Sequence, residues 1–168
     1  GVVRLCMELG AKAVLGNHAR ARLEVDGLPG KLVGWLAKQP LMRVDDDLVQ
    51  VHAGLHPRWT AKDVKRIAAG DFTQAEADYC THVRYCDARG LQPERDWPPP
   101  GPPFRPWDDF YSGRRRVIFG HWARRRLVIT KRVVGLDTGA CYGGPLTAWI
   151  AEDDRIVQVA GQKPLRQT

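Results

Sequence analysis

Histidine lies beside glycine at three places in the chain where an apolar run stops. These places are AVLGNH with Asn17 and His18, VQVHAG with His52, and VIFGHW with His121. Strands that end in tight glycine turns can carry side chains from distant parts of a chain to one sheet edge, where ligand sites commonly form. Imidazole nitrogens and an amide oxygen bind divalent transition metals such as Mn, Fe, Co or Zn. The residue types and their repeated setting therefore predict a metal site.

A single histidine of this kind is weaker evidence than the set. One histidine alone is more often a core or surface residue than a metal ligand, and GNH by itself is a weak motif. The same setting at three predicted strand ends reverses that balance. Two metal ions about 4 Å apart would clamp a phosphoryl group and make hydroxide available near neutral pH. The chemistry that the set favours is therefore attack at phosphorus.

The first third of the chain contains the helices and strands that must position Asn17 and His52. An apolar face predicts a helix over residues 1–9, which Gly10 ends. The run 11–15 predicts a buried strand that ends on GNH. A second apolar helical face stops before Pro40. PLMRV and LVQVH flank three aspartates, which predicts a hairpin whose return strand delivers His52.

The rest of the chain predicts helices first and then short strands. Thr60 and Asp63 resemble a capping box that opens a helix over 61–69, and another helix covers 73–82. Residues 87–106 hold seven prolines, which predicts an extended surface connection outside any helix or sheet ladder. The short strands that follow are RVIFGH, RLVIT, RVVGLD, LTAWI and RIVQV. This order predicts an α/β or α+β layered domain.

Length and composition fit one soluble globular domain over residues 1–168. No apolar run approaches the roughly 20 residues that a membrane helix needs, so we expect a cytoplasmic protein with no membrane partner. The net charge of +7 favours anionic partners, either phosphorylated substrates or nucleic acid. The four cysteines form no C-x-x-C pair, which favours reduced thiols over disulfides.

Four motifs in order, LGNH, VHAGLHP, IFGHWA and GLDTGACYGGPLTAW, resemble the later motifs of calcineurin-like metallophosphoesterases of the phosphoprotein-phosphatase branch. The similarity runs from about residue 10 to residue 160. Within that branch, WLAKQPL, HAGLHPRW, THVRYC and FGHWA resemble the symmetrical diadenosine tetraphosphate hydrolases and related serine/threonine phosphatases. The resemblance implies a β-sandwich flanked by helices and two divalent metal ions (Mn, Co, Fe or Zn).

The resemblance also implies roles for individual residues. Asn17, His52 and His121 would be ligands of the second metal. His18 would be the general acid that protonates the leaving-group oxygen, a role that suits an imidazole near neutral pH.

Two further residues would meet the substrate. Arg84 would grip phosphate oxygens, since a planar guanidinium binds them in a bidentate manner; its alternative is a solvated helix arginine. Tyr142 would border the substrate, or else be a core tyrosine. His56 and His82 are expected to be structural or surface residues.

The sequence departs from the family pattern in two ways. The opening motifs GD-x-H and GD-x-x-DRG, which supply the first metal's ligands in the family, do not occur among the 168 residues. We therefore expect a chain that lacks its N-terminal strands and is inactive or impaired alone. The second departure is Ala19, where an acidic residue usually follows GNH and helps to position the histidine.

The resulting expectation is metal-dependent hydrolysis of dinucleoside polyphosphates such as diadenosine tetraphosphate. Removal of nucleotide caps from RNA and dephosphorylation of phosphoserine or phosphothreonine are alternatives, with an RNA end or a phosphoprotein as partner. Arginine triplets at 114–116 and 124–126 would attract a polyphosphate or an RNA end, or they are charged strand edges that resist aggregation. A non-catalytic basic module that binds nucleic acid or a partner is a further alternative.

Overall fold

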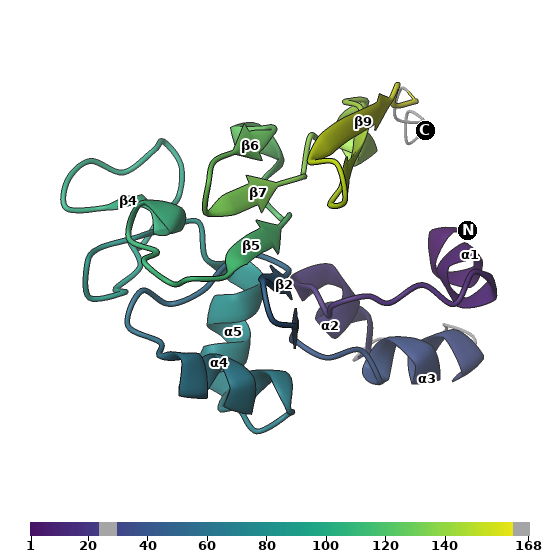
Figure 1. The fold of residues 1–168 in the computed structure, drawn as a ribbon, viewed down its shortest axis with the longest axis horizontal. Coiled ribbons are helices and arrows are strands. Elements are labelled where there is room, and N and C mark those ends of the chain that lie inside the picture. The colour runs from purple at the N-terminus through teal and green to yellow at the C-terminus, as the bar shows by residue number, and fades with distance from the viewer. Residues whose placement is uncertain (24–29, 163–168) are drawn as a thin grey trace.

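A five-stranded mixed sheet carries the two strand ends that precede His52 and His121 (Figure 1). The computed structural model describes residues 1–23 and 30–162. The strand order in the sheet is β1-β2-β5-β7-β6. Its strands are β1 (Met42–Val44), β2 (Leu48–Val51), β5 (Arg116–Phe119), β6 (Val128–Ile129) and β7 (Val133–Gly135). Strands β2, β5 and β7 run parallel, whereas β1 and β6 are antiparallel to their neighbours.

The predicted hairpin before His52 is present. Strand β1 pairs with β2 so that Met42 lies opposite Val51. The Asp45 side chain accepts hydrogen bonds from the backbone N–H groups of Asp47 and Leu48 at 3.1 and 2.7 Å, which closes the turn. The chain emerges from β2 directly into His52, as the pattern predicted.

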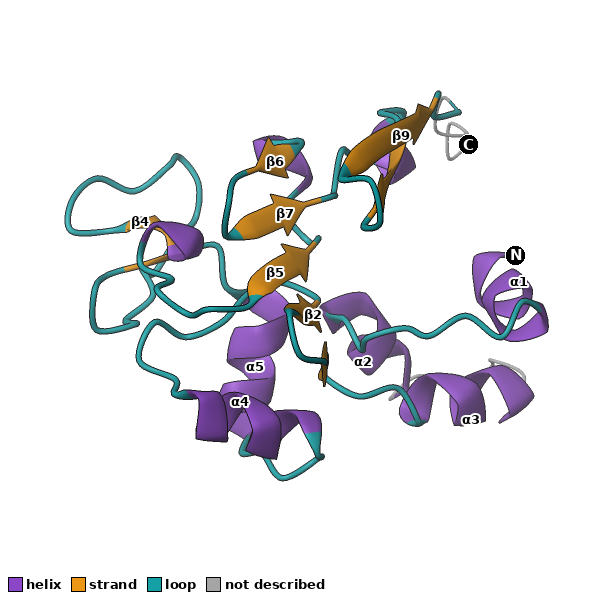
Figure 2. Ribbon diagram, in the orientation of Figure 1, coloured by secondary structure: helices purple, strands orange, loops and turns teal. Residues whose placement is uncertain are grey.

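Two capped helices cover the β1–β2 end of the sheet. They are α4 (Ala61–Ala68) and α5 (Gln74–His82), and each begins with a complete capping box, one from Thr60 and Asp63 and the other from Thr73 and Glu76. Helix α4 packs on β1, and Figure 2 shows both helices on the same side of the sheet. Both predicted helices are confirmed, and α5 ends one residue before the loop that carries Arg84.

The two predicted N-terminal helices form, but the strand predicted between them is wrong and an unpredicted helix follows its position. The predicted helices are α1 (Val2–Glu8) and α3 (Gly30–Ala37), and the unpredicted one is α2 (Asn17–Leu23). Residues 11–16 form no strand. Their backbone groups bond instead to two side chains and one carbonyl: Ala13 N–H to Gln39 at 3.3 Å, Ala13 O to Arg43 at 2.9 Å, and Leu15 N–H to Pro40 O at 2.8 Å. GNH therefore opens helix α2 rather than ending a strand.

The Pro-rich connection contains no helix or strand over residues 87–104, as predicted, but one correction applies at its end. Strand β4 (Arg105–Pro106) pairs with β3 (Tyr85–Cys86), so Pro106 does take part in a short ladder. It does so in a two-residue edge pair, where a missing N–H is tolerated. Single-turn 3-10 helices follow at Trp107–Asp109, Ala123–Arg125 and Ala140–Tyr142.

The remaining strands form a separate antiparallel hairpin, β8 (Leu146–Ile150) with β9 (Arg155–Val159). Figure 1 shows this hairpin at the β6–β7 end of the sheet. The predicted layered α/β architecture, a mixed sheet flanked by helices, is thus confirmed. Fully buried side chains from the sheet, α4, α5 and the 3-10 turn at Trp107 form the core.

All four cysteines are free thiols, as predicted: Cys80 and Cys86 are buried and Cys141 is exposed. Among residues 1–23 and 30–162, no helix has the length and apolar character needed to cross a membrane.

Candidate metal centre and adjoining cavity

The register of parallel strands β2 and β5 brings His52 and His121 together. Gln50 lies opposite Ile118. His52, which follows β2, and His121, which lies two residues after β5, are therefore at the same carboxyl edge of the sheet. The Gly120 N–H donates to the His52 carbonyl at 2.9 Å, and the two imidazole ring centroids are 5.0 Å apart. Two histidines separated by 69 positions in sequence are therefore neighbours because their strands are hydrogen-bonded partners.

Asn17 reaches the same point from the first turn of α2. Its side-chain Oδ1 lies 2.9 Å from His52 Nε2. Gly16 makes this approach possible, because a Cβ at this position would lie 2.5 Å from His52 Nδ1. The glycine of GNH thus leaves room for the His52 ring next to the asparagine.

His121 is held in an unusual backbone conformation with one ring nitrogen already bonded. Its φ is +66°, a region that non-glycine residues enter rarely and mainly at functional sites. Its Nε2 lies 3.1 Å from the His82 carbonyl oxygen. Because a carbonyl only accepts, this Nε2 carries the proton and Nδ1 keeps its lone pair. Metal-binding histidines are commonly oriented by such a bond to a backbone carbonyl.

Both imidazoles are neutral at pH 7. Burial is the main cause that lowers the pKa of His52 to about 4, and the neighbouring His18, His82 and Arg84 act in the same direction. Burial together with Arg84 and His52 lowers the pKa of His121 to about 3, although the His82 carbonyl opposes the shift. Neutral imidazole is the form that binds a metal, so the environment favours ligation.

Asn17, His52 and His121 therefore lie together, and His18 follows directly in α2 with an exposed side chain. Within the described ranges, no group of three or more His, Cys, Asp or Glu side chains is arranged to hold a metal. A centre here depends on the Asn17 amide oxygen in addition to two imidazoles. The donor set of one oxygen and two nitrogens fits a divalent transition ion.

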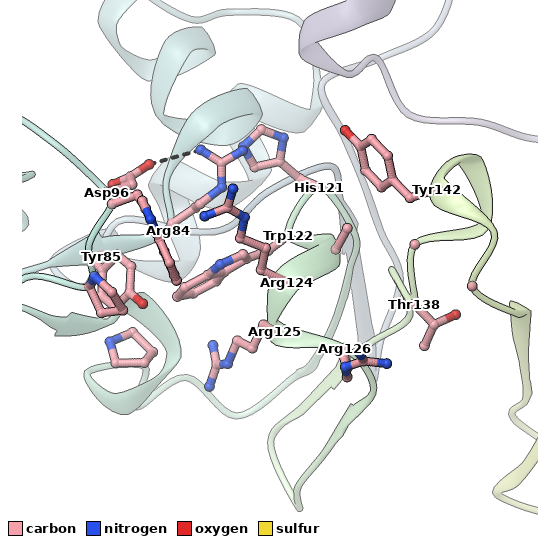
Figure 3. A pocket seen from close by; sticks show the side chains of 16 residues that line it. Arg84, Tyr85, Asp96, His121, Trp122, Arg124, Arg125, Arg126, Thr138 and Tyr142 are labelled. Atoms are coloured by element: carbon pink, nitrogen blue, oxygen red, sulfur yellow. Dashed lines mark hydrogen bonds and ion pairs between the residues drawn. The ribbon is translucent and has the colours of Figure 1, made fainter. Parts of the chain in front are cut away.

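A cavity of about 1000 Å³ opens beside His121. Arg84 lies in its wall, in the loop after α5 rather than within a helix, and its Nη1 donates to Asp96 at 2.9 Å. Figure 3 shows the Arg84 guanidinium between Asp96 and the His121 ring. Tyr142 borders the cavity and is 74% exposed, so it is not a core tyrosine.

The two arginine triplets differ in their surroundings. Arg115 donates to the Asp45 carbonyl, and Arg116 forms an ion pair with Asp154 at 2.7 Å. Neither arginine lines the cavity. By contrast, the second triplet lines the cavity: Arg124, Arg125 and Arg126. Arg125 is neutralised by Asp108 through both carboxylate oxygens. Among the residues that the structure describes, no carboxylate pairs with Arg124 or Arg126.

Sequence reasoning missed two contributions to this region. His82, expected to be structural or a surface residue, orients His121 through its backbone carbonyl, which no sequence pattern reveals. Trp97, in the Pro-rich connection, lines the cavity; its position within an otherwise polar and proline-rich stretch was the available signal. His56 has the expected structural role, packed between Trp59 and Tyr79 with ring centroids 5.8 and 4.9 Å away.

Comparisons with known proteins find relatives that share one name and a solved structure with a similar fold. No family model matches the chain. Curated relatives called symmetrical bis(5'-nucleosyl)-tetraphosphatase are 31% identical in Edwardsiella ictaluri and 30% identical in Vibrio parahaemolyticus. The first match covers 98% of this chain and 81% of the relative, and the second covers 92% and 80%. A crystal structure assigned to a diadenosine tetraphosphatase superposes with a TM-score of 0.76 at 27% identity, over 96% of this chain and 73% of the other.

Proposed function

The chain belongs to the symmetrical bis(5'-nucleosyl)-tetraphosphatases, which are calcineurin-like metallophosphoesterases, and from this premise we propose that it hydrolyses dinucleoside polyphosphates such as diadenosine tetraphosphate. The relatives are hydrolases by name, and the family implies divalent metal ions. Beyond the family, we propose the substrate, the residues that bind the metal and the number of ions.

The observation that carries the proposal is the meeting of Asn17, His52 and His121. Asn17 Oδ1 is 2.9 Å from His52 Nε2, the imidazole centroids are 5.0 Å apart, and the His82 carbonyl leaves Nδ1 of His121 free to bind. These three side chains would hold one divalent ion. When bound, such an ion supplies a Lewis acid for a phosphoryl oxygen and a nucleophile at neutral pH.

The chain's other site residues act on the substrate directly. His18, next to Asn17 and exposed, would donate a proton to the leaving-group oxygen. Arg84 would bind phosphate oxygens once these displace Asp96 from its guanidinium. Tyr142 would border the bound substrate from the loop at Ala140–Tyr142.

We also propose two ions in the working site, each Mn, Co, Fe or Zn. In the family, GD-x-H and GD-x-x-DRG supply ligands for the first ion, and neither motif occurs in the 168 residues. The residues present accordingly account for one of the two ions. This division shapes the test, because turnover needs both ions whereas binding by Asn17, His52 and His121 needs one.

The test compares the chain alone with a chimera that carries, ahead of Gly1, the segment of the Edwardsiella ictaluri relative that precedes its matched region. Each protein is supplied with Mn²⁺ and diadenosine tetraphosphate, and the products are separated by anion-exchange chromatography. We expect the chimera to release two ADP per substrate, EDTA to stop the reaction, and the chain alone to be slow or inactive.

Parallel assays decide among the other substrate classes. A serine/threonine phosphopeptide and a nucleotide-capped RNA end are offered to the chimera at the same concentration. Faster hydrolysis of the phosphopeptide would replace the proposal with a protein phosphatase, and faster release of the cap would replace it with RNA decapping. No hydrolysis of any of the three, with tight RNA binding by the chain, would favour the non-catalytic basic module.

A further inference from the structure

Trp97 is a large aromatic side chain that the fold leaves in solvent at the cavity. It lies in the Pro-rich connection, lines the cavity and is 61% exposed. The other tryptophan of the cavity wall, Trp122, is 8% exposed and packs edge-to-face on Tyr85 with centroids 4.7 Å apart. Trp122 thus contributes to the packing of the wall, whereas most of the Trp97 indole is available to a ligand.

One face of the Trp97 indole is already occupied by a cation. The Arg124 guanidinium carbon lies 4.2 Å from the centroid of the Trp97 ring system, a favourable cation–π arrangement. An arginine in such a contact keeps N–H donors on its guanidinium, and these can bind phosphate oxygens. Since no carboxylate pairs with Arg124 in the ranges 1–23 and 30–162, those donors are free to meet a phosphate.

The connection that carries Trp97 is fixed at the adjacent residue. Asp96 accepts a hydrogen bond from Arg84 at 2.9 Å, and Figure 3 shows this pair beside His121. In the free chain this ion pair and the Arg124 contact therefore hold the indole at the wall of the cavity that His121 also lines.

We propose that Trp97 and Arg124 form a nucleoside-phosphate subsite of the cavity, in which a nucleobase stacks on the open face of Trp97 and the adjoining phosphate is bound by Arg124. This inference rests on the proposed function, since it assigns the binding of one nucleoside of the same substrate. It makes the cavity selective for phosphates that carry a planar base over inorganic polyphosphate.

Binding without turnover tests the subsite. Isothermal titration calorimetry measures ADP and inorganic pyrophosphate binding to the 168-residue chain and to Trp97→Ala. Because stacking a base on an aromatic side chain contributes about 1–3 kcal/mol, we expect Trp97→Ala to weaken ADP binding about tenfold and to leave pyrophosphate binding unchanged. Trp97→Phe keeps an aromatic ring and should restore most of the ADP affinity.

Two further variants serve as comparisons. Leu91→Ala removes another exposed apolar side chain of the same connection, 65% exposed and outside the cavity lining, and should bind ADP like the unmodified chain. Arg124→Ala should weaken both ligands. Unchanged ADP binding in Trp97→Ala would overturn the subsite, and so would an equal loss for ADP and pyrophosphate.

The binding measurements on Trp97→Ala and the hydrolysis assay of the chimera can give independent results. Selective loss of ADP binding in Trp97→Ala would support the subsite even if the chimera cleaved no diadenosine tetraphosphate. Conversely, rapid cleavage together with unchanged ADP binding in Trp97→Ala would retain the function and overturn the subsite.

Discussion

His121 shows how much of the candidate centre depends on single residues. Its positive φ turns the side chain at the end of β5, and a backbone carbonyl from a different helix end bonds its Nε2. Backbone strain of this kind costs about 1–3 kcal/mol and persists only where surrounding contacts impose it. Here those contacts are the Gly120–His52 hydrogen bond and the His82 carbonyl.

Substitution of each histidine should separate metal binding from proton transfer. We expect His52→Ala and His121→Ala to abolish stoichiometric Mn²⁺ binding, because each removes a ligand. His18→Ala should keep the metal and slow turnover of the chimera about 100-fold or more, as is typical of a lost general acid. Metal content by atomic emission and steady-state rates check this, and equal metal loss in all three variants would contradict the separate roles.

Two glycines at the centre provide a matched pair. A Cβ on Gly16 would lie 2.5 Å from His52 Nδ1, whereas a Cβ on Gly120 would meet nothing closer than 3.8 Å. Gly16→Ala should therefore displace the His52 ring and weaken Mn²⁺ binding at least about tenfold, the scale seen when ligand orientation is lost. Gly120→Ala should bind Mn²⁺ normally; comparable weakening in both variants would refute the steric account.

At the scale of the residue, the sequence predicted that Asn17, His52 and His121 come together, and they do, although only His52 and His121 follow strands and Asn17 opens a helix. It could not identify the Arg84–Asp96 pair or the His82 carbonyl. Both are long-range contacts made after the chain has folded, and neither leaves a local pattern.

Helices α4 and α5 are joined by a partly exposed ion pair between Arg66 and Glu76, and Glu76 also caps α5. Glu76 completes the capping box of α5, and both of its carboxylate oxygens meet the Arg66 guanidinium of α4. The hydrogen bond from Arg66, followed by the Thr73 backbone N–H, lowers the pKa of Glu76 to about 2. The charged form is thus more favourable in the folded chain than in the unfolded chain.

This pKa shift gives a signed pH dependence. Since the folded pKa lies below the unfolded value of 4.5, the stabilisation is complete above pH 4.5 and is lost as the pH falls toward about 2. Because Gln can keep the capping box but loses the charge, Glu76→Gln should lower the free energy of unfolding by about 0.5 kcal/mol at pH 7, and the difference should shrink by pH 3. Urea unfolding at both pH values measures this, and a difference that grows on acidification would contradict it.

At the scale of the element, the capping box at Thr60 and the hairpin around the three aspartates were predictable because their signals are local. The strand expected at Ala11–Leu15 was wrong because a short apolar run has no fixed partner. Its backbone bonds went to Gln39 and Arg43, side chains that lie far along the chain. Pro106 pairs with Tyr85 in a two-residue strand pair. This pairing also depends on a distant segment, and an edge position tolerates the missing proline N–H.

The charge of the whole molecule should govern how it meets its ligands. The chain carries a net charge of +7, and the cavity is lined by Arg124 and Arg126, with which no carboxylate of residues 1–23 or 30–162 pairs. Raising the salt concentration from about 0.03 to about 0.3 M should weaken ADP binding several-fold because exposed charges are screened. Adenosine, which has no phosphate, should bind equally at both concentrations, and a parallel loss for adenosine would refute an electrostatic origin.

The proposed function requires one ion held jointly by three segments that the fold brings together. Crystals of the chain grown with Mn²⁺, measured at the manganese absorption edge, test this directly. We predict an anomalous difference peak within bonding distance of Asn17 Oδ1, His52 Nε2 and His121 Nδ1. If crystals grown at saturating Mn²⁺ show no peak there, or show a manganese ion bound by other residues, the proposed centre is wrong.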